Sequence, residues 1–389
     1  MAAKPRPWLT RNLVVLSLVS LTQDAASELM YPLLPLFLTG ILAAPAIALG
    51  VVEGFAELVA GLSKFYAGRA SDHIGRKTLI TSGYGLAAIG KVFVASALAW
   101  PMVLVGRAID RVGKGIRSTP RDAMITSDVA KEHFTQAFGF HRSADTLGAV
   151  IGPIFALLGL SVLNNDIRAV MWWAIIPAVL SMILTLLIRE TQAPKRLQTN
   201  VQKVRMPSTF WKTAIPLIVI SAINIPDTLL LLRLSELGVS AKNIVLAYIS
   251  FNVVYTVSAY PAGVIASRLP PRIVYAIGMG AFGITFSAIG QLREQSVWLF
   301  VIVALYGLFP ALTDGIGKSL IAMSAPKEVH GQAQGIFQSL AGGSILIAGL
   351  WAGAIWTLGS GQGSLPFTIA GGLGLIAGGY LFTTSKRMS

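Results

Sequence analysis

Long apolar runs and short polar connections alternate along the whole chain. A helix of about 20 residues is needed to cross a hydrocarbon core of about 30 Å, and apolar runs of about that length recur twelve times. The runs cover approximately residues 13–38, 46–68, 78–100, 102–124, 134–163, 170–188, 213–232, 244–265, 273–292, 297–323, 331–358 and 367–382. This pattern predicts an all-α polytopic membrane protein with twelve transmembrane helices.

The composition agrees with this prediction. Only 12% of the residues are charged and 54% are hydrophobic, and the mean hydropathy is +0.68, so most of the chain is too apolar to form the surface of a soluble globular protein. Lys4, Arg6 and Arg11 precede the first run, as in the basic end of a signal peptide. The run is longer than a typical signal core and no convincing cleavage site follows, so we expect a retained helix.

The distribution of charge along the chain distinguishes a nucleic-acid partner from a lipid bilayer. A formal net charge of +14 is compatible with nucleic-acid binding, but the basic residues gather at the N-terminus, in every second connection and at the C-terminus. The opposite connections hold only Arg168, Arg233, Lys242 and Arg293. This positive-inside asymmetry predicts a lipid bilayer as the partner, no nucleic acid, and both termini in the cytoplasm of a bacterial inner (plasma) membrane. With no Cys in the chain, disulfides and thiolate metal sites are excluded.

The longest polar connection divides the chain into two related halves. It predicts an N-terminal six-helix bundle over residues 1–188, a cytoplasmic linker over 189–212 and a C-terminal six-helix bundle over 213–389. The stretch "KEHFTQAFGFHRS" at 131–143 matches "KEVHGQAQGIFQS" at 327–339, and a "DxxGK" motif begins at both Asp110 and Asp314. These ordered matches predict an internal repeat of two six-helix bundles, which is a known plan of transporters.

One connection is unusually rich in charge. The stretch "GRASDHIGRK", residues 68–77, lies on the predicted cytoplasmic side between the second and third runs. A basic anchoring loop would satisfy the positive-inside rule by itself. The stretch also resembles the loop signature of the major facilitator superfamily, in which a glycine is followed by an acidic residue and then by "GRK". The resemblance implies the major facilitator fold and a conformational latch made of Gly68, Asp72, Gly75, Arg76 and Lys77.

Two further stretches in the first half support the same resemblance. "GRAIDRVGKG" is similar to the fourth-span signature of the family through Gly106, Arg107, Gly113 and Gly115, although Asp110 and Arg111 depart from its usual amide and glycine. "GAVIGP" resembles the fifth-span signature of the family's proton-linked efflux antiporters. It implies a hinge, and a small-residue packing face with a kink is the simpler interpretation. The hinge residues would be Gly148, Gly152 and Pro153.

Charged residues inside the predicted spans are candidates for function. A charge at mid-bilayer costs about 2.5–3.5 kcal/mol by insertion scales, so such groups are usually paired or face water. Asp24 and Glu28 are four residues apart and share one helix face, and Glu53 and Glu57 repeat that spacing. The other first-half members are Lys64, Lys91, Arg107, Asp110, Arg111, Lys114, His141, Arg142 and Asp145. The second half has Asp227, Asp314 and Lys318, so we expect ion coupling in the first half.

Two uses of these charges involve ion pairs and protons. Structural pairs between helices are the simplest expectation for Lys64, Lys91, Asp145 and Lys318. A proton relay is the second use, because two carboxylates on one face repel each other and this favours proton uptake by one of them. The predicted proton-coupling residues are Asp24, Glu28, Arg107 and Asp110. Asp24, about halfway through its span, is the stronger candidate for carrying the proton.

Two other uses involve ligands. Arg107, Arg111 and Arg142 could bind an anionic substrate, since guanidinium groups bind carboxylates and phosphates bidentately. Alternatively, carboxylate and imidazole ligands could hold a metal cation. Those ligands would be Asp24, Glu28, Glu53, Glu57 and His141. With four His and no Cys, a soft-metal site is disfavoured and a hard-metal site stays open, and we predict no resident metal.

The substrate cavity is predicted to have walls from both halves. Polar and aromatic residues of the seventh, eighth and eleventh runs occur where the resemblance places the family's cavity, although such residues also serve as packing or interface anchors. The predicted cavity residues are Glu53, Glu57, Arg111, His141, Arg142, Asn224, Asp227, Tyr248, Asn252, Tyr255, Phe337 and Gln338.

The motifs that are missing narrow the function. The stretch "TDGIGKS" ends like a phosphate-binding loop but lacks the first glycine, which disfavours ATP-driven transport, and no catalytic constellation indicates an enzyme. We therefore expect a monomeric secondary transporter that exports a small organic molecule by alternating access, driven by the proton gradient without a cofactor. Transport of an anionic metabolite, a metal ion or a metal chelate, and a non-transporting membrane sensor, are the alternatives.

Overall fold

The computed structural model describes residues 8–70, 75–130, 133–190, 206–326, 330–359 and 361–385. Within these ranges the regular structure is helical throughout, as expected for apolar segments in lipid, where each backbone N–H and C=O group needs a partner inside its own segment. The structure thus confirms the predicted all-α class.

The first half of the chain forms eight numbered helices. After α1, a short helical extension of Tyr31–Leu33, α2 and Phe37–Ile41 completes the first span. Their bounds are α1 Arg11–Met30, α2 Leu34–Leu36, α3 Ala46–Ala70, α4 Arg76–Ala95, α5 Trp100–Asp128, α6 Phe134–Val162, α7 Ile167–Trp173 and α8 Ile175–Thr185.

The second half forms the remaining eight helices. Their bounds are α9 Ser208–Ser221, α10 Asp227–Glu236, α11 Ala241–Arg268, α12 Pro271–Gln291, α13 Val297–Tyr306, α14 Leu308–Met323, α15 His330–Ala354 and α16 Ser364–Ser385. The tenth predicted span is one segment of two helices, α13 and α14, that meet at Gly307.

Ten helical segments of the described chain are long and apolar enough to cross a membrane. The two other predicted spans fall short for different reasons. The helix α5 carries many charges along its length. The seventh span, expected to be continuous over 213–232, is broken: α9 ends at Ser221 and α10 begins at Asp227. Pro226 lacks an N–H group and cannot continue the helix, and the Trp351 indole donates to the Ala222 carbonyl at 2.9 Å.

Contacts within the chain define two units. One contains Met1–Tyr31 and Val59–Val204, and the other contains Pro32–Leu58 and Arg205–Ser389. The units therefore place Pro32–Leu58, including the first part of α3, with the second half of the sequence. The predicted domain boundaries at 188 and 212 stay a prediction.

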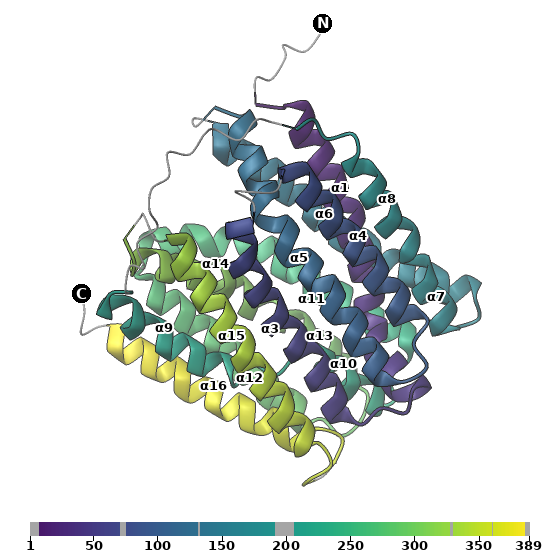
Figure 1. The fold of residues 1–389 in the computed structure, drawn as a ribbon. Coiled ribbons are helices and arrows are strands. Elements are labelled where there is room, and N and C mark those ends of the chain that lie inside the picture. Colours follow the sequence, from purple (N-terminus) through teal and green to yellow (C-terminus); the bar gives the residue numbers. More distant parts are fainter. Residues whose placement is uncertain are drawn as a thin grey trace, which may run out of the picture. The chain divides into compact units, whose positions relative to one another are not determined.

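In the first unit, α1 packs along α6 and α4 packs along α5 (Figure 1). Glycines permit the second of these contacts. A Cβ atom added to Gly90 would lie 2.5 Å from the Gly106 carbonyl oxygen, and one added to Gly83 would lie 2.7 Å from that of Gly113. Close approach of this kind replaces the hydrophobic effect as the force that holds helices together in lipid.

The second unit repeats this packing scheme. Here α9 packs along α15, α12 packs along α14, and α12 also packs along α16, as α4 does along α8 in the first unit. The first part of α3 joins the unit through glycines as well, because Gly50 faces the backbone of Gly349 and Gly54 faces that of Leu346. The shared scheme agrees with two six-helix repeats.

A buried arginine joins a helix to two connections at one end of the second unit. Arg233, only 1% exposed, donates to the Gln362 carbonyl at 2.7 Å and to the Leu292 carbonyl. Nearby, the Trp356 indole donates to the Glu236 carboxylate at 3.0 Å. Arg233 therefore fastens α10 to the connections that follow α12 and α15.

Candidate functional site

The Cβ atoms of the two acidic residues of α1 lie against the two glycines of "GAVIGP" on α6. A Cβ atom added to Gly148 would be 3.1 Å from the Asp24 Cβ and 2.3 Å from the Leu21 carbonyl oxygen. One added to Gly152 would be 2.9 Å from the Glu28 Cβ and 2.5 Å from the Ala25 carbonyl oxygen. The glycines therefore let α6 contact α1 directly at the level of both carboxylates.

Two charged residues of α5 have partners on α4. The ammonium group of Lys91 lies 3.2 Å from the Asp110 carboxylate, and their side chains are 4% and 7% exposed. Two turns further along α5, Arg117 donates to the Gly83 carbonyl at 3.1 Å and its guanidinium lies 4.5 Å from the centre of the Tyr84 ring. Lys91 thus belongs to the predicted class of structural ion pairs.

A basic stripe runs along α5 next to Asp110 and Arg117. Its members are spaced by three, four or seven residues and therefore lie on one side of the helix: Arg107, Arg111, Lys114 and Arg121. Arg107 lies 5.8 Å from the centre of the Tyr31 ring. Burial is the largest influence on Asp24, and after it come a repelling charge from Asp145 and attracting ones from Lys114, Arg117 and Arg121. The site of Asp24 therefore balances one carboxylate against several cations.

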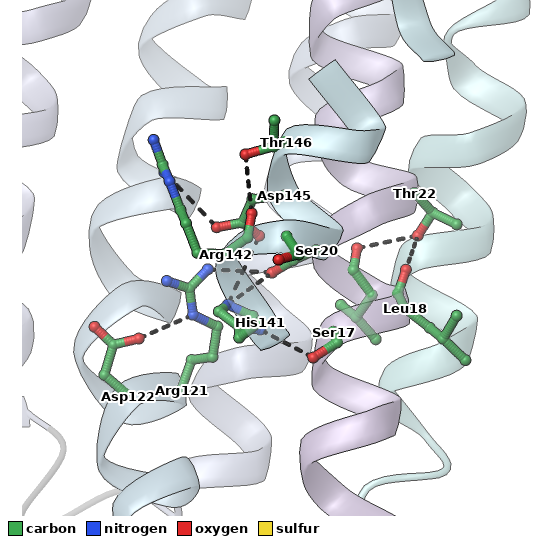
Figure 2. A network of polar contacts seen from close by, with 12 residues as sticks. Ser17, Leu18, Ser20, Thr22, Arg121, Asp122, His141, Arg142, Asp145 and Thr146 are labelled. Atoms are coloured by element: carbon green, nitrogen blue, oxygen red, sulfur yellow. Dashed lines mark hydrogen bonds and ion pairs between the residues drawn. The ribbon is translucent and has the colours of Figure 1, made fainter. Parts of the chain in front are cut away.

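A polar network surrounds His141 in the first unit, and Figure 2 shows its members on α1, α5 and α6. The imidazole, 3% exposed, lies 3.4 Å from the hydroxyl oxygens of both Ser17 and Ser20 on α1. Its Nε2 atom is also 3.7 Å from Asp145, one turn along α6.

The network continues from Ser20 to α4 and α5. The Ser20 hydroxyl lies 3.3 Å from the Tyr84 hydroxyl and accepts from Arg121 at 3.2 Å, and Arg121 also donates to Asp122 at 3.0 Å. Sequence reasoning did not single out Ser17, Ser20, Tyr84 or Arg121 as site residues. A signal for the α1 members was present, since Ser17, Ser20 and Asp24 follow helical spacing.

The other first-half predictions have different surroundings. Arg142 is exposed and lies 3.9 Å from Asp145, so it points away from the buried part of the network. Glu53 is 4% exposed on α3, and the Glu57 backbone is in contact with Gly342 of α15. Glu53 and Glu57 therefore belong to the second unit, whereas Arg111, His141 and Arg142 belong to the first.

Some of the predicted residues of the second half make hydrogen bonds within the second unit. Tyr306 donates to Asp227 at 2.8 Å, Tyr255 donates to Asp314 at 3.2 Å, and Asn252 donates to the Tyr248 carbonyl at 3.0 Å. The Asn224 side chain lies in the break between α9 and α10, and Phe337 and Gln338 are half-buried on α15. That all these residues line one cavity stays a prediction.

Part of the predicted latch is described. Gly75 precedes α4, Arg76 donates to the Ala123 carbonyl at 3.3 Å, and Lys77 donates to the Leu186 carbonyl at 2.9 Å. These contacts join the start of α4 to the ends of α5 and α8. Asp72 lies outside the described residues, and Gly68 is described only as part of α3, so the latch stays a prediction. In the described part of the chain, no three His, Asp or Glu residues are grouped to hold a metal ion.

Comparison with known proteins defines the family. The sequence model of the Major Facilitator Superfamily matches residues 16–232 and again residues 214–388. The chain belongs to this superfamily, and it is therefore a multi-pass membrane transporter and not an enzyme. This confirms the resemblance read from the loop and span motifs.

Individual relatives agree with the family. The chain is 27% identical to an uncharacterised MFS-type transporter of Methanocaldococcus jannaschii over 90% of this chain and 89% of that one. It is 26% identical to the class H tetracycline resistance protein of Pasteurella multocida over 49% of this chain and 48% of that one. Among solved structures, the nucleoside transporter NupG superposes with a TM-score of 0.79 at 13% identity, over 97% of this chain and 100% of that one. The last similarity concerns the fold alone.

Proposed function

We propose that this transporter exports a small organic molecule in exchange for protons, by alternating access. It works as a monomer in a bacterial inner membrane with both termini in the cytoplasm, and the proton gradient is its source of energy. The similarity to a tetracycline resistance protein and the "GAVIGP" stretch support export over import.

The contact between α1 and α6 carries this proposal. Asp24 and Glu28 share one face of α1 and are held against Gly148 and Gly152. Asp24 also experiences the charges of Asp145, Lys114, Arg117 and Arg121. A carboxylate among opposing charges changes its proton affinity when those charges move relative to it. A small displacement of α1 along α6 would therefore load or release a proton.

The roles of the four predicted coupling residues differ. Asp24 carries the proton and Glu28, one turn away, assists it. Arg107 lies on the basic stripe beside Tyr31, and its positive charge tunes the proton affinity of the two carboxylates. The Asp110 carboxylate is engaged by Lys91, so we assign it to holding α4 and α5 together.

Proteoliposomes test the proposal. Purified protein is reconstituted with pyranine inside the vesicles, and tetracycline and ethidium are added as probes. Addition of a transported compound should move protons in the wild type, whereas Asp24→Asn should reduce proton movement at least tenfold and Glu28→Gln should reduce it less. Glu294→Gln, in the exposed connection after α12, is the control that should behave as wild type. Undiminished proton movement in both carboxylate variants would refute the proposed role of this site.

A second candidate function is the transport of an anionic metabolite. The basic stripe of α5 favours it, because four cations on one helix face can bind carboxylate or phosphate groups. A panel of organic anions and cations of similar size separates the two. Preference for anions, together with its loss in Arg111→Gln, would favour this second function over export of neutral or cationic compounds.

A further inference from the structure

The hydroxyl group of Ser20, in the polar network of the first unit, has more neighbours than it can bond. Its oxygen lies 3.3 Å from the Tyr84 hydroxyl and 3.4 Å from the His141 Nε2 atom. Arg121 donates to it at 3.2 Å, and the Asp145 carboxyl group also interacts with it. A hydroxyl group has one proton to donate and two lone pairs to accept. Four neighbours therefore compete for three positions, and one of them must bond elsewhere.

The Asp145 carboxylate has an unused bonding position beside the same imidazole. Its Oδ1 atom is buried and makes no hydrogen bond to any residue that the structure describes. It lies 3.7 Å from the Nε2 atom of His141, one turn away on α6 (Figure 2). Hydrogen bonds between nitrogen and oxygen are about 2.7–3.2 Å long, so the two atoms are neighbours without a bond. Because a buried oxygen without a partner is costly, this one indicates a second state of the site in which the bond is made.

One proton would supply the missing bond. If the carboxyl group holds the proton, Oδ1 of Asp145 donates to Nε2 of His141, and if the imidazole holds it, Nε2 donates to Oδ1. The two atoms must approach each other by about 0.5 Å or more to reach hydrogen-bond distance. In both cases Nε2 is engaged by Asp145 and is lost to Ser20. Proton uptake by the pair and the contact of His141 with Ser20 on α1 are therefore alternatives.

The surrounding charges connect this pair to the carboxylate of α1. The charged and titratable side chains around the pair are Asp24 on α1, Tyr84 on α4, Arg121 and Asp122 on α5, and Arg142 on α6. The pair carries one negative charge when Asp145 is ionised and no net charge once it has bound a proton. Because the charge of Asp145 repels that of Asp24, proton uptake by the pair removes this repulsion. The occupancy of the pair therefore acts on Asp24 as well as on the contact with Ser20.

We propose that His141 and Asp145 form a second proton-binding site, and that His141 is the positioning residue that transmits its occupancy to α1. Without the proton, the imidazole contacts Ser20 and holds α6 on α1. With the proton, His141 and Asp145 bond to each other and the contact with Ser20 is lost. The proposal rests on the proposed proton-coupled function, and it supplies the step that links proton binding to a displacement of α1 along α6.

Nuclear magnetic resonance of the histidines tests the proton site. The chain has four His, so the purified full chain with isotope-labelled histidine gives few signals, and that of His141 is the one absent in His141→Gln. Between about pH 8 and about pH 5, the range in which imidazoles titrate, the Nε2 resonance should move as its partner changes from Ser20 to Asp145. In Asp145→Asn the resonance should no longer depend on pH, because the remaining arginines oppose a charge on the imidazole. Ser20→Ala should alter the resonance at the alkaline end and leave it unchanged at the acidic end.

Transport in proteoliposomes tests the link to α1. Without the hydroxyl group of Ser20, α1 is no longer held when the site is empty, so the proton loses its control over the displacement. Ser20→Ala should therefore lower accumulation driven by a pH gradient at least fivefold and keep substrate exchange within about twofold of the wild type. The matched control is Ser143→Ala, because the Ser143 hydroxyl donates to the Gly139 carbonyl of its own helix at 2.9 Å. This variant should behave as the wild type in both experiments.

Thermal unfolding of each variant verifies that it is folded at the temperature of the assay. A His141 resonance that does not respond to pH in the wild type, the same response in Asp145→Asn, or equal accumulation by Ser20→Ala and Ser143→Ala would each overturn the proposal. Because the resonances require no transport, they are independent of the test of Asp24. Full proton movement in Asp24→Asn would leave the pair standing as a pH-dependent contact, and failure of the pair would leave Asp24 standing as the proton carrier.

Discussion

Replacing Lys91 with methionine will destabilise the first unit by about 3–5 kcal/mol, because it leaves the buried Asp110 carboxylate without its counter-charge. The pair lies 3.2 Å apart with both side chains almost fully buried, at a point where Gly90 and Gly106 bring α4 and α5 into backbone contact. Water could solvate the remaining carboxylate only if the two helices separated. Thermal unfolding in detergent, followed by loss of the monodisperse peak in size-exclusion chromatography, measures the effect.

A double variant distinguishes the lost pair from lost packing. Removing both charges, in Lys91→Met with Asp110→Ala, should recover at least half of the stability lost in the single variant, since a buried pair is often neutral when replaced as a whole. Lys212→Met, at an exposed position of α9, should unfold as the wild type does. A double variant as unstable as Lys91→Met would mean that the lysine stem, not the ion pair, stabilises this contact.

Introducing a side chain at Gly152 should affect both stability and transport. The added Cβ atom would lie 2.5 Å from the Ala25 carbonyl oxygen and 2.8 Å from the Leu29 nitrogen, and backbone atoms cannot give way as a flexible side chain can. Gly152→Val should therefore lower the free energy of unfolding by about 1–3 kcal/mol, as overpacking does. Because α1 must move away, the variant should also lose most proton-coupled transport.

Gly139 offers a matched control on the same helix. An added Cβ atom there has no atom within 4 Å, so Gly139→Ala should keep wild-type transport and gain up to about 1 kcal/mol from helix propensity. Gly148→Val, against the Asp24 level of α1, should resemble Gly152→Val. If both valine variants transport as the wild type does, direct contact between α1 and α6 is not needed for the cycle.

The helices were predictable from hydropathy, because lipid requires each spanning segment to satisfy its own backbone. The break in the seventh span was not predicted, although Pro226 was visible in the sequence. A window of apolar residues averages over a proline, and the Trp351 indole that supports the break comes from a helix more than a hundred residues away. Hydropathy also does not explain how α5 can carry so many charges inside the membrane. They are tolerated because Asp110 pairs with Lys91 and Arg117 donates to the Gly83 carbonyl.

The sequence predicted several residues of the candidate site, but it did not predict which of them contact each other. The spacing of Asp24 and Glu28 placed both on one face of α1, and "GAVIGP" indicated a close helix contact, but only the structure places the two features against each other. Likewise, Asp110 was expected among the coupling residues, and Lys91 was expected to have a partner. That the two residues pair with each other depends on the register of α4 against α5, which the glycines set and the sequence does not reveal.

The hydroxyl groups around His141 were missed for a related reason. Serines are common in transmembrane helices, where they can bond to their own backbone, so Ser17 and Ser20 carried little weight by themselves. Their role follows from the proximity of α1, α4, α5 and α6, which brings Tyr84 and Arg121 to the same place.

Two transport modes compared in Asp24→Asn test the central claim most directly. Exchange of labelled for unlabelled substrate across the membrane needs alternating access but no net proton movement, whereas accumulation driven by a pH gradient needs both. The probe is whichever of tetracycline, ethidium and tetraphenylphosphonium the wild type transports. We predict that Asp24→Asn retains exchange within about threefold of the wild type and loses gradient-driven accumulation. Gradient-driven accumulation at the wild-type level in this variant would contradict the account.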